Sequence, residues 1–239
     1  MLPWVELDRT PLPSGDLRLM RRGRDFSIKI GVAELMTSRL SGSEEALAIL
    51  ACDKLRERPA PHILIGGLGM GFTLRAALRA TGPKAKIVVA ELVPTIVAWA
   101  RGALADLFAG CLDDPRVSIF SGDVADAIRG AKTPYDAILL DVDNGPEGMT
   151  QDANDRLYGA RGLGDSWRAL RPGGVLAIWS AFPSRTFAKR LEQCGFAVEE
   201  KRVRAGGVHG GARHLIWLAT KPALKKTPNP PGRADAAAA

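Results

Sequence analysis

The sequence has few of the residues that build disulfide frameworks and metal centres. Its 239 residues include three cysteines and three histidines, all far apart: Cys52, Cys111, Cys194, His62, His209 and His214. An odd number of scattered cysteines suits a reducing compartment. Neither set has the spacing of a zinc site. We therefore expect no metal, and we interpret the histidines as ordinary structural residues.

Long apolar runs are also absent. No stretch approaches the roughly 20 apolar residues of a membrane-spanning helix. The first residues, MLPWVE, do not show a basic segment followed by an apolar one. These absences predict a cytoplasmic chain with no signal peptide and no membrane contact. With 46% hydrophobic and 25% charged residues, the chain has enough apolar material for one sizeable core.

The net charge is +7 and the isoelectric point is about 9.6, a balance that can indicate nucleic-acid binding. Much of the positive charge lies in two groups, one near the N-terminus and one in the tail: Arg18, Arg21, Arg22, Arg24 and Lys29, then Lys221, Lys225, Lys226 and Arg233. No zinc-finger spacing or aromatic-rich RNA-binding pattern accompanies them. We interpret both groups as solvated surface and expect no nucleic-acid partner.

The stretch HILIGGLGMGFTL, residues 62–74, organises the rest of the chain. A short apolar run leads into four glycines, Gly66, Gly67, Gly69 and Gly71, and then into a predicted helix. Glycine permits close approach of a ligand to the backbone, and a helix start offers free N–H donors. The pattern predicts a ligand-binding turn at the end of a parallel strand. A tight structural turn is the alternative.

Acidic residues close the next apolar runs. Glu91 lies about 20 residues beyond the glycine turn, the spacing at which an acidic residue meets ribose hydroxyls. Asp123 follows a third run and Asp141 closes a fourth. Because the carboxyl ends of parallel strands share one edge of the sheet, the order predicts a nucleoside pocket there. For Asp123, capping the helix that follows is the alternative.

Strand and helix patterns alternate from residue 62 onward, which predicts a parallel sheet with helices on both faces. We expect strands near 63–66, 87–91, 116–120, 136–141 and 174–180, and helices near 72–81, 94–108, 123–130, 160–171 and 184–194. Residues 196–204 and 213–220 read as a terminal antiparallel pair. Before the glycine turn we expect a hairpin over 17–30, a polar connection over 36–42, and a helix over 46–58 with Ser43 as its N-cap. The predicted units are a small β region (1–42), a catalytic domain (43–221) and a disordered tail (222–239).

These elements look like a Rossmann-like, class I S-adenosylmethionine-dependent methyltransferase fold. Within it the chain resembles the spermidine synthase (polyamine aminopropyltransferase) family over about residues 15–220. The first motif is GGLGMG at 66–71 followed by TLR at 73–75, which is similar to the family's Gly-Gly-Gly-Asp-Gly-Gly followed by Thr-Leu-Arg. The other motifs are Glu-Leu-Val at 91–93, Asp-Pro-Arg-Val at 114–117 with Gly122-Asp123, and YDAILLD at 135–141. The resemblance implies an α/β fold with a mostly parallel seven-stranded sheet, a C-terminal antiparallel strand and an N-terminal β-hairpin.

The resemblance also implies roles for individual residues. Gly66, Gly67, Gly69, Gly71 and Glu91 would hold the nucleoside of the donor, Asp123 would contact its adenine, and Asp141 would be the catalytic base. Substrate binding would fall to Glu44, Asp143, Asn144 and Tyr158. The donor would be S-adenosylmethionine or its decarboxylated form, the acceptor a small amine, and the assembly a homodimer. For Tyr158, a packing role is equally open.

The chain departs from the family in the amine-binding region. Met70 replaces the aspartate of the glycine loop, Gly42 and Ser43 replace Tyr-His before Glu44, and the Asp-x-x-Asp motif ends in Asn144. The acidic residues that follow the fourth run suit a cationic acceptor: Asp141, Asp143, Glu147, Asp152 and Asp155. A solvated loop with helix-capping residues is the alternative.

Three functions therefore remain open. The first is aminopropyl transfer in polyamine biosynthesis, and the second is methyl transfer from intact S-adenosylmethionine to an unknown acceptor. The third is a non-catalytic binding protein on a transferase fold. If Asp141 faces a cation, its ionised form is favoured at neutral pH.

Overall fold

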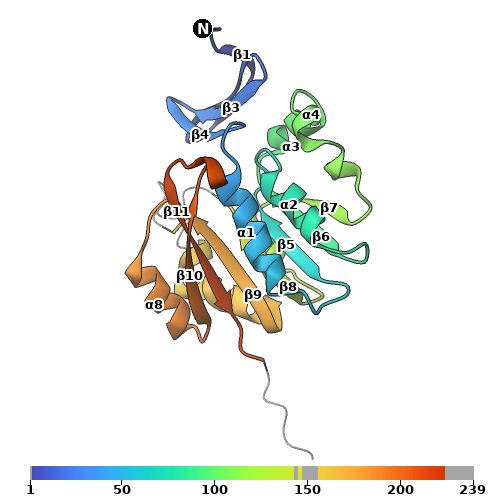
Figure 1. Cartoon of the computed structure of the whole chain (residues 1–239), viewed down its shortest axis with the longest axis vertical. Helices are drawn as coiled ribbons and strands as arrows, with labels where there is room; N and C mark the ends of the chain where they lie inside the picture. The colour runs from blue at the N-terminus through green and yellow to red at the C-terminus, as the bar shows by residue number, and fades with distance from the viewer. Residues whose placement is uncertain (1, 143–144, 147–155, 224–239) are drawn as a thin grey trace, which may run out of the picture.

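A seven-stranded sheet forms the centre of the molecule (Figure 1). The computed structural model describes residues 2–142, 145–146 and 156–223. The strand order is β10-β11-β9-β8-β5-β6-β7, and neighbours β5 to β9 pair in parallel. β11 pairs antiparallel with β9 on one side and with β10 on the other. The strands are β5 His62–Gly66, β6 Lys86–Glu91, β7 Val117–Ser121, β8 Tyr135–Leu140, β9 Leu170–Ser180, β10 Ala197–Arg204 and β11 Arg213–Thr220. The predicted sheet is confirmed.

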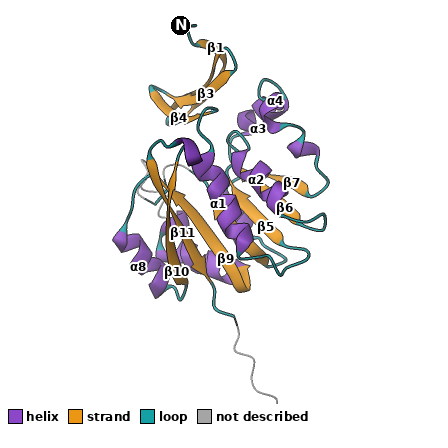
Figure 2. Cartoon of the chain, viewed as in Figure 1, coloured by secondary structure: helices purple, strands orange, loops and turns teal. Residues whose placement is uncertain are grey.

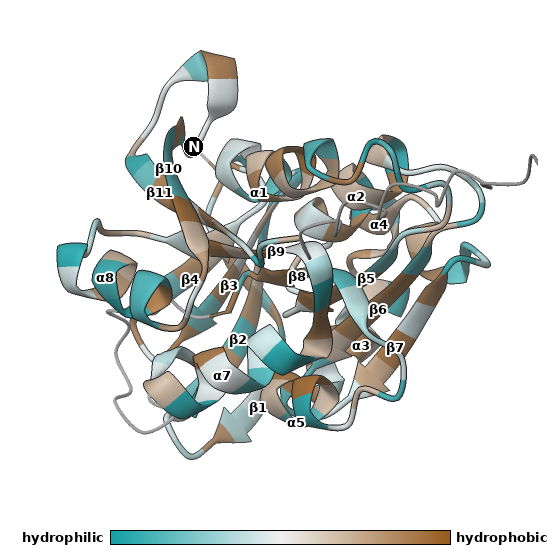
Figure 3. Ribbon diagram, turned by 90° about the horizontal axis from the view of Figure 1, so that it is seen from below, coloured by the Kyte–Doolittle hydropathy of each residue, from teal (hydrophilic) through white to brown (hydrophobic). Residues whose placement is uncertain are grey.

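Helices cover both faces of this sheet (Figures 2 and 3). Successive residues of β5 point to opposite sides: Ile63 and Ile65 pack into one hydrophobic cluster and Leu64 into the other. This two-sided burial explains why the strand is a continuous apolar run. The first cluster includes residues of α1 to α4 and the second includes residues of α5, α7 and α8. The helices are α1 Gly42–Asp53, α2 Phe72–Ala80, α3 Pro94–Arg101, α4 Ala105–Phe108, α5 Val124–Arg129, α7 Ala160–Ala169 and α8 Arg185–Gln193, with short 3-10 turns η1 Cys111–Asp113 and η2 Gly207–His209.

The N-terminal region is a separate four-stranded antiparallel sheet that stands above α1 in Figure 1. Its strands are β1 Val5–Leu12, β2 Gly15–Arg22, β3 Asp25–Ile30 and β4 Ala33–Thr37. The hairpin predicted over 17–30 is correct for β2 and β3, but the prediction missed β1 and placed the end of β4 in a connection. Side chains tie the small sheet to the body, since Trp99 Nε1 donates to Asp8 Oδ2 over 2.6 Å.

Two helix predictions are wrong in detail. The first helix runs over 42–53 rather than 46–58, so Ser43 lies inside its first turn, and Ser41 is the N-cap. The helix expected over 94–108 is two helices, because the chain leaves helical geometry at Gly102, where φ is −112° and ψ is −106°. The remaining helices begin and end within two residues of the predicted bounds.

A buried ion pair fixes the end of the sheet opposite the glycine turn. Asp136 is fully buried at the start of β8. Arg58 Nη1 donates to its Oδ1 over 2.6 Å, and the backbone N–H of His62 donates to its Oδ2 over 2.8 Å. Asp136 thereby joins β5 to β8, which keeps the carboxyl ends of these two strands side by side at the other edge.

Candidate active site

The glycine turn lies between β5 and α2, as predicted. Gly67 has a φ of +85° and Gly71 a φ of +75°, both in the left-handed region that favours glycine. A Cβ atom on Gly67 would lie 2.7 Å from the Asp141 carbonyl oxygen, and one on Gly71 would lie 2.5 Å from the Phe108 ring. The turn is therefore held against the end of β8 on one side and an aromatic ring on the other.

Glu91 fastens the glycine turn from the end of β6. Its side chain is buried, its Oε2 accepts from the Leu68 N–H over 2.9 Å, and its Oε1 accepts from the Val93 N–H over 2.8 Å. Burial raises the pKa of this carboxyl, and the backbone donors act in the opposite direction. Ribose binding by Glu91 stays a prediction.

Asp123 caps a helix. Its Oδ1 accepts from the Ala125 N–H over 2.8 Å at the start of α5. Its Oδ2 lies 3.6 Å from Arg156 Nη2. The capping alternative is therefore confirmed, while the adenine contact stays a prediction.

Asp141 lies directly after β8, beside the glycine turn. Its backbone N–H donates to the Gly66 carbonyl over 3.1 Å, and the Thr73 hydroxyl donates to its Oδ2 over 2.6 Å. Burial and the nearby Glu44 carboxylate raise the pKa of Asp141 to about 7, although the Thr73 bond lowers it. With a pKa of about 7, Asp141 is partly protonated at neutral pH in the free protein. That a facing cation favours its ionised form stays a prediction.

Glu44 completes a pair of carboxyl groups with Asp141. It lies in the first turn of α1, and the Ser43 hydroxyl donates to its Oε2 over 2.6 Å. Burial also raises the pKa of Glu44. Thr73 links the two elements, since its Oγ1 lies 3.4 Å from the Glu44 carbonyl oxygen. Two adjacent carboxyl groups in a partly buried edge form a site suited to a cation.

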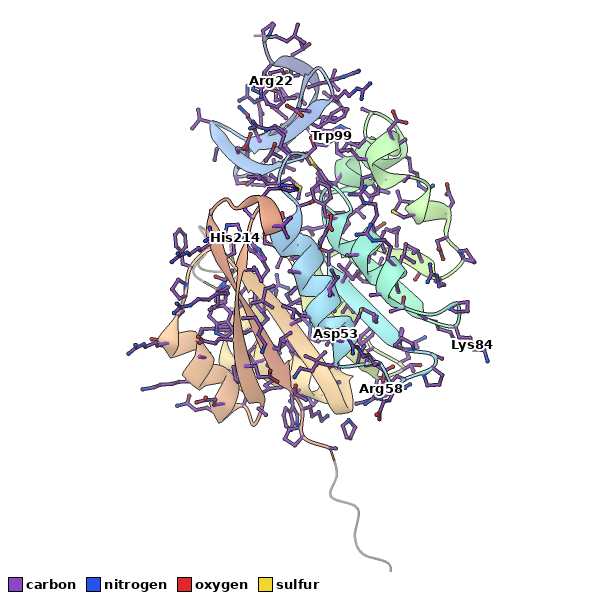
Figure 4. The ribbon with its side chains drawn as sticks, viewed as in Figure 1. Arg22, Asp53, Arg58, Lys84, Trp99 and His214 are labelled. Atoms are coloured by element: carbon purple, nitrogen blue, oxygen red, sulfur yellow. The ribbon has the colours of Figure 1, made fainter. Side chains whose placement is uncertain are left out.

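Two aromatic residues that the sequence analysis did not assign to a site lie on the α1 side of this pair. His214, near the start of β11, has its Nδ1 3.0 Å from Ser43 Oγ. Its ring meets Trp179 of β9 edge to face, with centroids 4.6 Å apart. The indole N–H of Trp179 is buried and has no hydrogen-bond partner within the described ranges. Figure 4 shows His214 close to the start of α1, at the end of the molecule opposite Arg58.

The residues that replace family motifs have structural roles here. Met70 is fully buried in the first hydrophobic cluster. Gly42 touches the turn between β10 and β11: its N–H donates to the Ala205 carbonyl over 2.8 Å. A Cβ atom on Gly42 would lie 2.2 Å from Gly207 N. The backbone of this turn occupies the space into which a larger side chain at position 42 would extend.

The other predicted site residues are placed as follows. Asp143 and Asn144 lie outside the described residues, as do Glu147, Asp152 and Asp155 of the acidic segment. Tyr158 is buried in the second hydrophobic cluster, edge to face with Phe187 at 5.8 Å. Its role in substrate binding stays a prediction. Over the described ranges there is no group of three or more potential metal-binding side chains, and no helix long and apolar enough to cross a membrane.

The strand order, the glycine turn and the acidic strand ends together define a class I methyltransferase-like fold with a candidate nucleoside site at its carboxyl edge. Solved structures share this fold. Spermidine synthase from Thermotoga maritima matches with a TM-score of 0.73 and 18% identity over 90% of this chain and 72% of its own. A spermidine synthase in complex with the transition-state analogue AdoDATO matches with a TM-score of 0.72 and 18% identity, over the same shares. Human methyltransferase-like protein 13 in complex with SAH matches with a TM-score of 0.55 and 20% identity, over 80% of this chain and 84% of its own.

Sequence comparison identifies the relatives more closely. The chain is 34% identical to a polyamine aminopropyltransferase of Mycobacterium tuberculosis over 180 residues, which are 70% of this chain and 34% of that protein. It is 35% identical to putrescine N-methyltransferase 1 of Nicotiana tabacum over 127 residues, 51% of this chain and 32% of that protein. No family model matches the chain. The chain spans about a third of the length of these curated relatives. The resemblance to the spermidine synthase family is confirmed.

Proposed function

We propose that the protein is an aminopropyltransferase that moves an aminopropyl group from decarboxylated S-adenosylmethionine to an amine. The observation that carries the proposal is the Asp141–Glu44 pair beside the glycine turn. The similarity to a polyamine aminopropyltransferase over 180 residues supports it. The glycine turn and Glu91 would hold the nucleoside, and the carboxyl pair would attract the cationic amine.

The reaction follows from this placement. The amine loses a proton to the Asp141 carboxylate, and its nitrogen lone pair attacks the carbon that bears the positive sulfur. A carbon–nitrogen bond forms while the carbon–sulfur bond breaks, and the electron pair of that bond neutralises the sulfur. The products are a longer amine and 5′-methylthioadenosine. The protein contributes chiefly position and one basic group.

A cationic donor or acceptor would lower the raised pKa of Asp141. In the empty site burial and Glu44 favour the protonated form. A bound ammonium or sulfonium group would reverse that preference, because an opposite charge favours the ionised form. The site would thus release a proton when it fills. Asp143, Asn144 and Tyr158 would supply further contacts to the amine.

Methyl transfer from intact S-adenosylmethionine is the second candidate function. Two observations favour it: Met70 replaces the acidic residue of the family's glycine loop, and the chain is similar to a putrescine N-methyltransferase. Both candidates share an amine acceptor and differ in the donor. Asp141 would act in the same way in either reaction.

A product analysis separates the candidates. The purified protein would be incubated with putrescine and either decarboxylated or intact donor, and the amine products identified by mass spectrometry. A product longer by an aminopropyl group supports the proposal, and a methylated diamine supports the second function. No product, together with no calorimetric binding of either donor, would support a non-catalytic binding protein.

The assembly and the domain division are proposals as well. Similarity to the family supports a homodimer, which light scattering would test against a monomer. Proteolysis would test whether residues 1–42 and 43–221 behave as two units.

A further inference from the structure

The hydrogen bonds at the start of α1 have one direction while the Glu44 carboxyl is ionised. Ser43 is fully buried, and its hydroxyl donates to Glu44 Oε2 over 2.6 Å. A hydroxyl has one proton and two lone pairs. Once that proton points at the Glu44 carboxylate, Ser43 Oγ can only accept from its other partner. That partner is His214, whose Nδ1 lies 3.0 Å away, so His214 must carry its proton on Nδ1.

The His214 ring is held in place for this bond. It packs edge to face with Trp179, at an interplanar angle of 71°, and β11 pairs with β9 along this stretch. Burial lowers the pKa of His214, so the ring is neutral at neutral pH. A neutral ring with its proton on Nδ1 can donate to Ser43 without adding a positive charge to the site.

The bonds continue toward the reacting centre. Glu44 raises the pKa of Asp141 through its charge, and Thr73 contacts both segments. The titratable groups acting on Glu44 are Asp141 after β8 and Glu45 on its own helix. Both favour the neutral form of Glu44, whereas the Ser43 hydroxyl favours the ionised form.

We propose that His214 is a positioning residue: its Nδ1–H bond to Ser43 directs the Ser43 proton onto Glu44 and so holds the Glu44 carboxylate ionised and oriented beside Asp141. His214 would not touch the reacting atoms. Its effect on catalysis rests on the proposed function, because Glu44 would matter there as a partner for the cationic amine.

Three substitutions separate the hydrogen bond from the packing. His214→Asn places an amide N–H near the position of Nδ1 and keeps the donor. His214→Phe keeps a ring against Trp179 and removes the donor. Ser43→Ala removes the intermediate hydroxyl. The 5′-methylthioadenosine affinity of all three should match that of the wild type, because the nucleoside half of the site is not touched.

The first test needs no substrate. Long-range ¹H–¹⁵N spectra of the full chain should show His214 protonated on Nδ1. The Glu44 carboxyl, followed by ¹³C resonance against pH, should titrate about one pH unit higher in His214→Phe and Ser43→Ala, the size expected when one hydrogen bond to a charged form is lost. In His214→Asn it should titrate as in the wild type. A proton on Nε2, or an unchanged Glu44 titration in His214→Phe, overturns the proposal.

The second test uses putrescine as the acceptor. We expect KM for putrescine to rise about tenfold in His214→Phe, the loss of one hydrogen bond to a charged group. His214→Asn should restore it, and the double variant His214→Phe/Ser43→Ala should be no worse than Ser43→Ala. Additive losses would show that His214 acts independently of Ser43 and would overturn the proposal. If the wild type transfers nothing to putrescine, the proposed function fails, and the spectra still decide the role of His214.

Discussion

Thr73 donates its hydroxyl to Asp141 across 2.6 Å, and this bond joins the start of α2 to the end of β8. This bond favours the ionised form of Asp141, whereas burial and the Glu44 charge favour its neutral form. The balance of these effects sets the acid–base behaviour of the site. Five predictions concern this contact, its neighbours and the opposite edge of the sheet.

Thr73→Val keeps the shape of the side chain and removes the donor. The pKa of Asp141 should then rise above about 7, by roughly one unit for one lost hydrogen bond. The acidic limb of the kcat/KM profile, which reports the free enzyme, should move upward by the same amount, so that kcat/KM falls at pH 7 and recovers near pH 9. The matched control is Thr81→Val, whose hydroxyl bonds only its own helix at the Ala77 carbonyl. Equal profiles for the two variants would remove Thr73 from this role.

Asp141→Asn removes the basic group and should lower turnover by roughly 10²–10⁴-fold, the usual contribution of a positioned acid or base. Donor affinity should change much less. Single-turnover rates against pH provide the measurement. The kcat/KM of the wild type, which reports the free enzyme, should rise as pH passes about 7, and that of the variant should not. Rates equal to the wild type at neutral pH would leave the carboxyl pair only an electrostatic role.

Asp141→Asn should lower turnover but raise the stability of the folded protein at alkaline pH. The folded-state pKa of Asp141, about 7, lies above the ordinary value of 3.8, so the native state binds the extra proton. This contribution to stability is fully present below pH 4 and is lost as pH rises through about 7. Asp141→Asn cannot ionise, and its melting temperature should therefore exceed that of the wild type at pH 8 by more than at pH 4. Thermal scans at the two values check the sign.

Glu91→Gln should weaken 5′-methylthioadenosine binding by about 1–3 kcal/mol, the range for hydrogen bonds that involve a charged group. The loss of affinity has two sources: the proposed ribose contact, and the hydrogen bonds that Glu91 accepts from the Leu68 and Val93 N–H groups. Calorimetry measures it, with the exposed Glu57→Gln as the control. An unchanged affinity in an intact fold would contradict the assignment.

Asp136→Asn tests the opposite edge of the sheet. Removing the buried charge breaks the ion pairs of Asp136 with Arg58 and Arg171 and should cost on the order of 3 kcal/mol of unfolding free energy. Urea unfolding measures this cost, and the exposed Asp53→Asn, paired with Arg56, provides the control. Affinity for the nucleoside should be retained while the fold persists. A loss below 1 kcal/mol would show that the pair contributes little to joining β5 and β8.

The central sheet could be predicted from the sequence because its signals are local. Ile63, Leu64 and Ile65 are buried on both faces and form an unbroken apolar run, and the glycines that follow permit a backbone geometry that other residues rarely adopt. Glu91 and Asp141 stand where such runs end. Apolar period and turn chemistry are properties of neighbouring residues, so they can be read without the fold.

The N-terminal strands and the acceptor side could not be predicted so fully. β1 is largely exposed and contains Pro11, so no alternating apolar pattern marks it. His214 meets Ser43 across 171 positions of the chain, and that contact depends on the register of β11 against β9. A motif shared with the family predicted Glu44. The imidazole bonded to its neighbour Ser43 comes from β11, and the pairing of β11 with β9 was not predicted.

The close approach of Gly42 to Gly207, where a Cβ atom would lie 2.2 Å from a backbone nitrogen, bears on how this protein can be re-engineered. In a mutant library that varies position 42 alone, almost every variant would have a misfolded or displaced α1, whatever acceptor is used for selection. Libraries that vary position 42 together with residues 206–211 allow the hairpin turn to retreat as the side chain grows. Directed evolution of acceptor choice therefore has to vary these two segments together, although they lie more than 160 residues apart in the sequence.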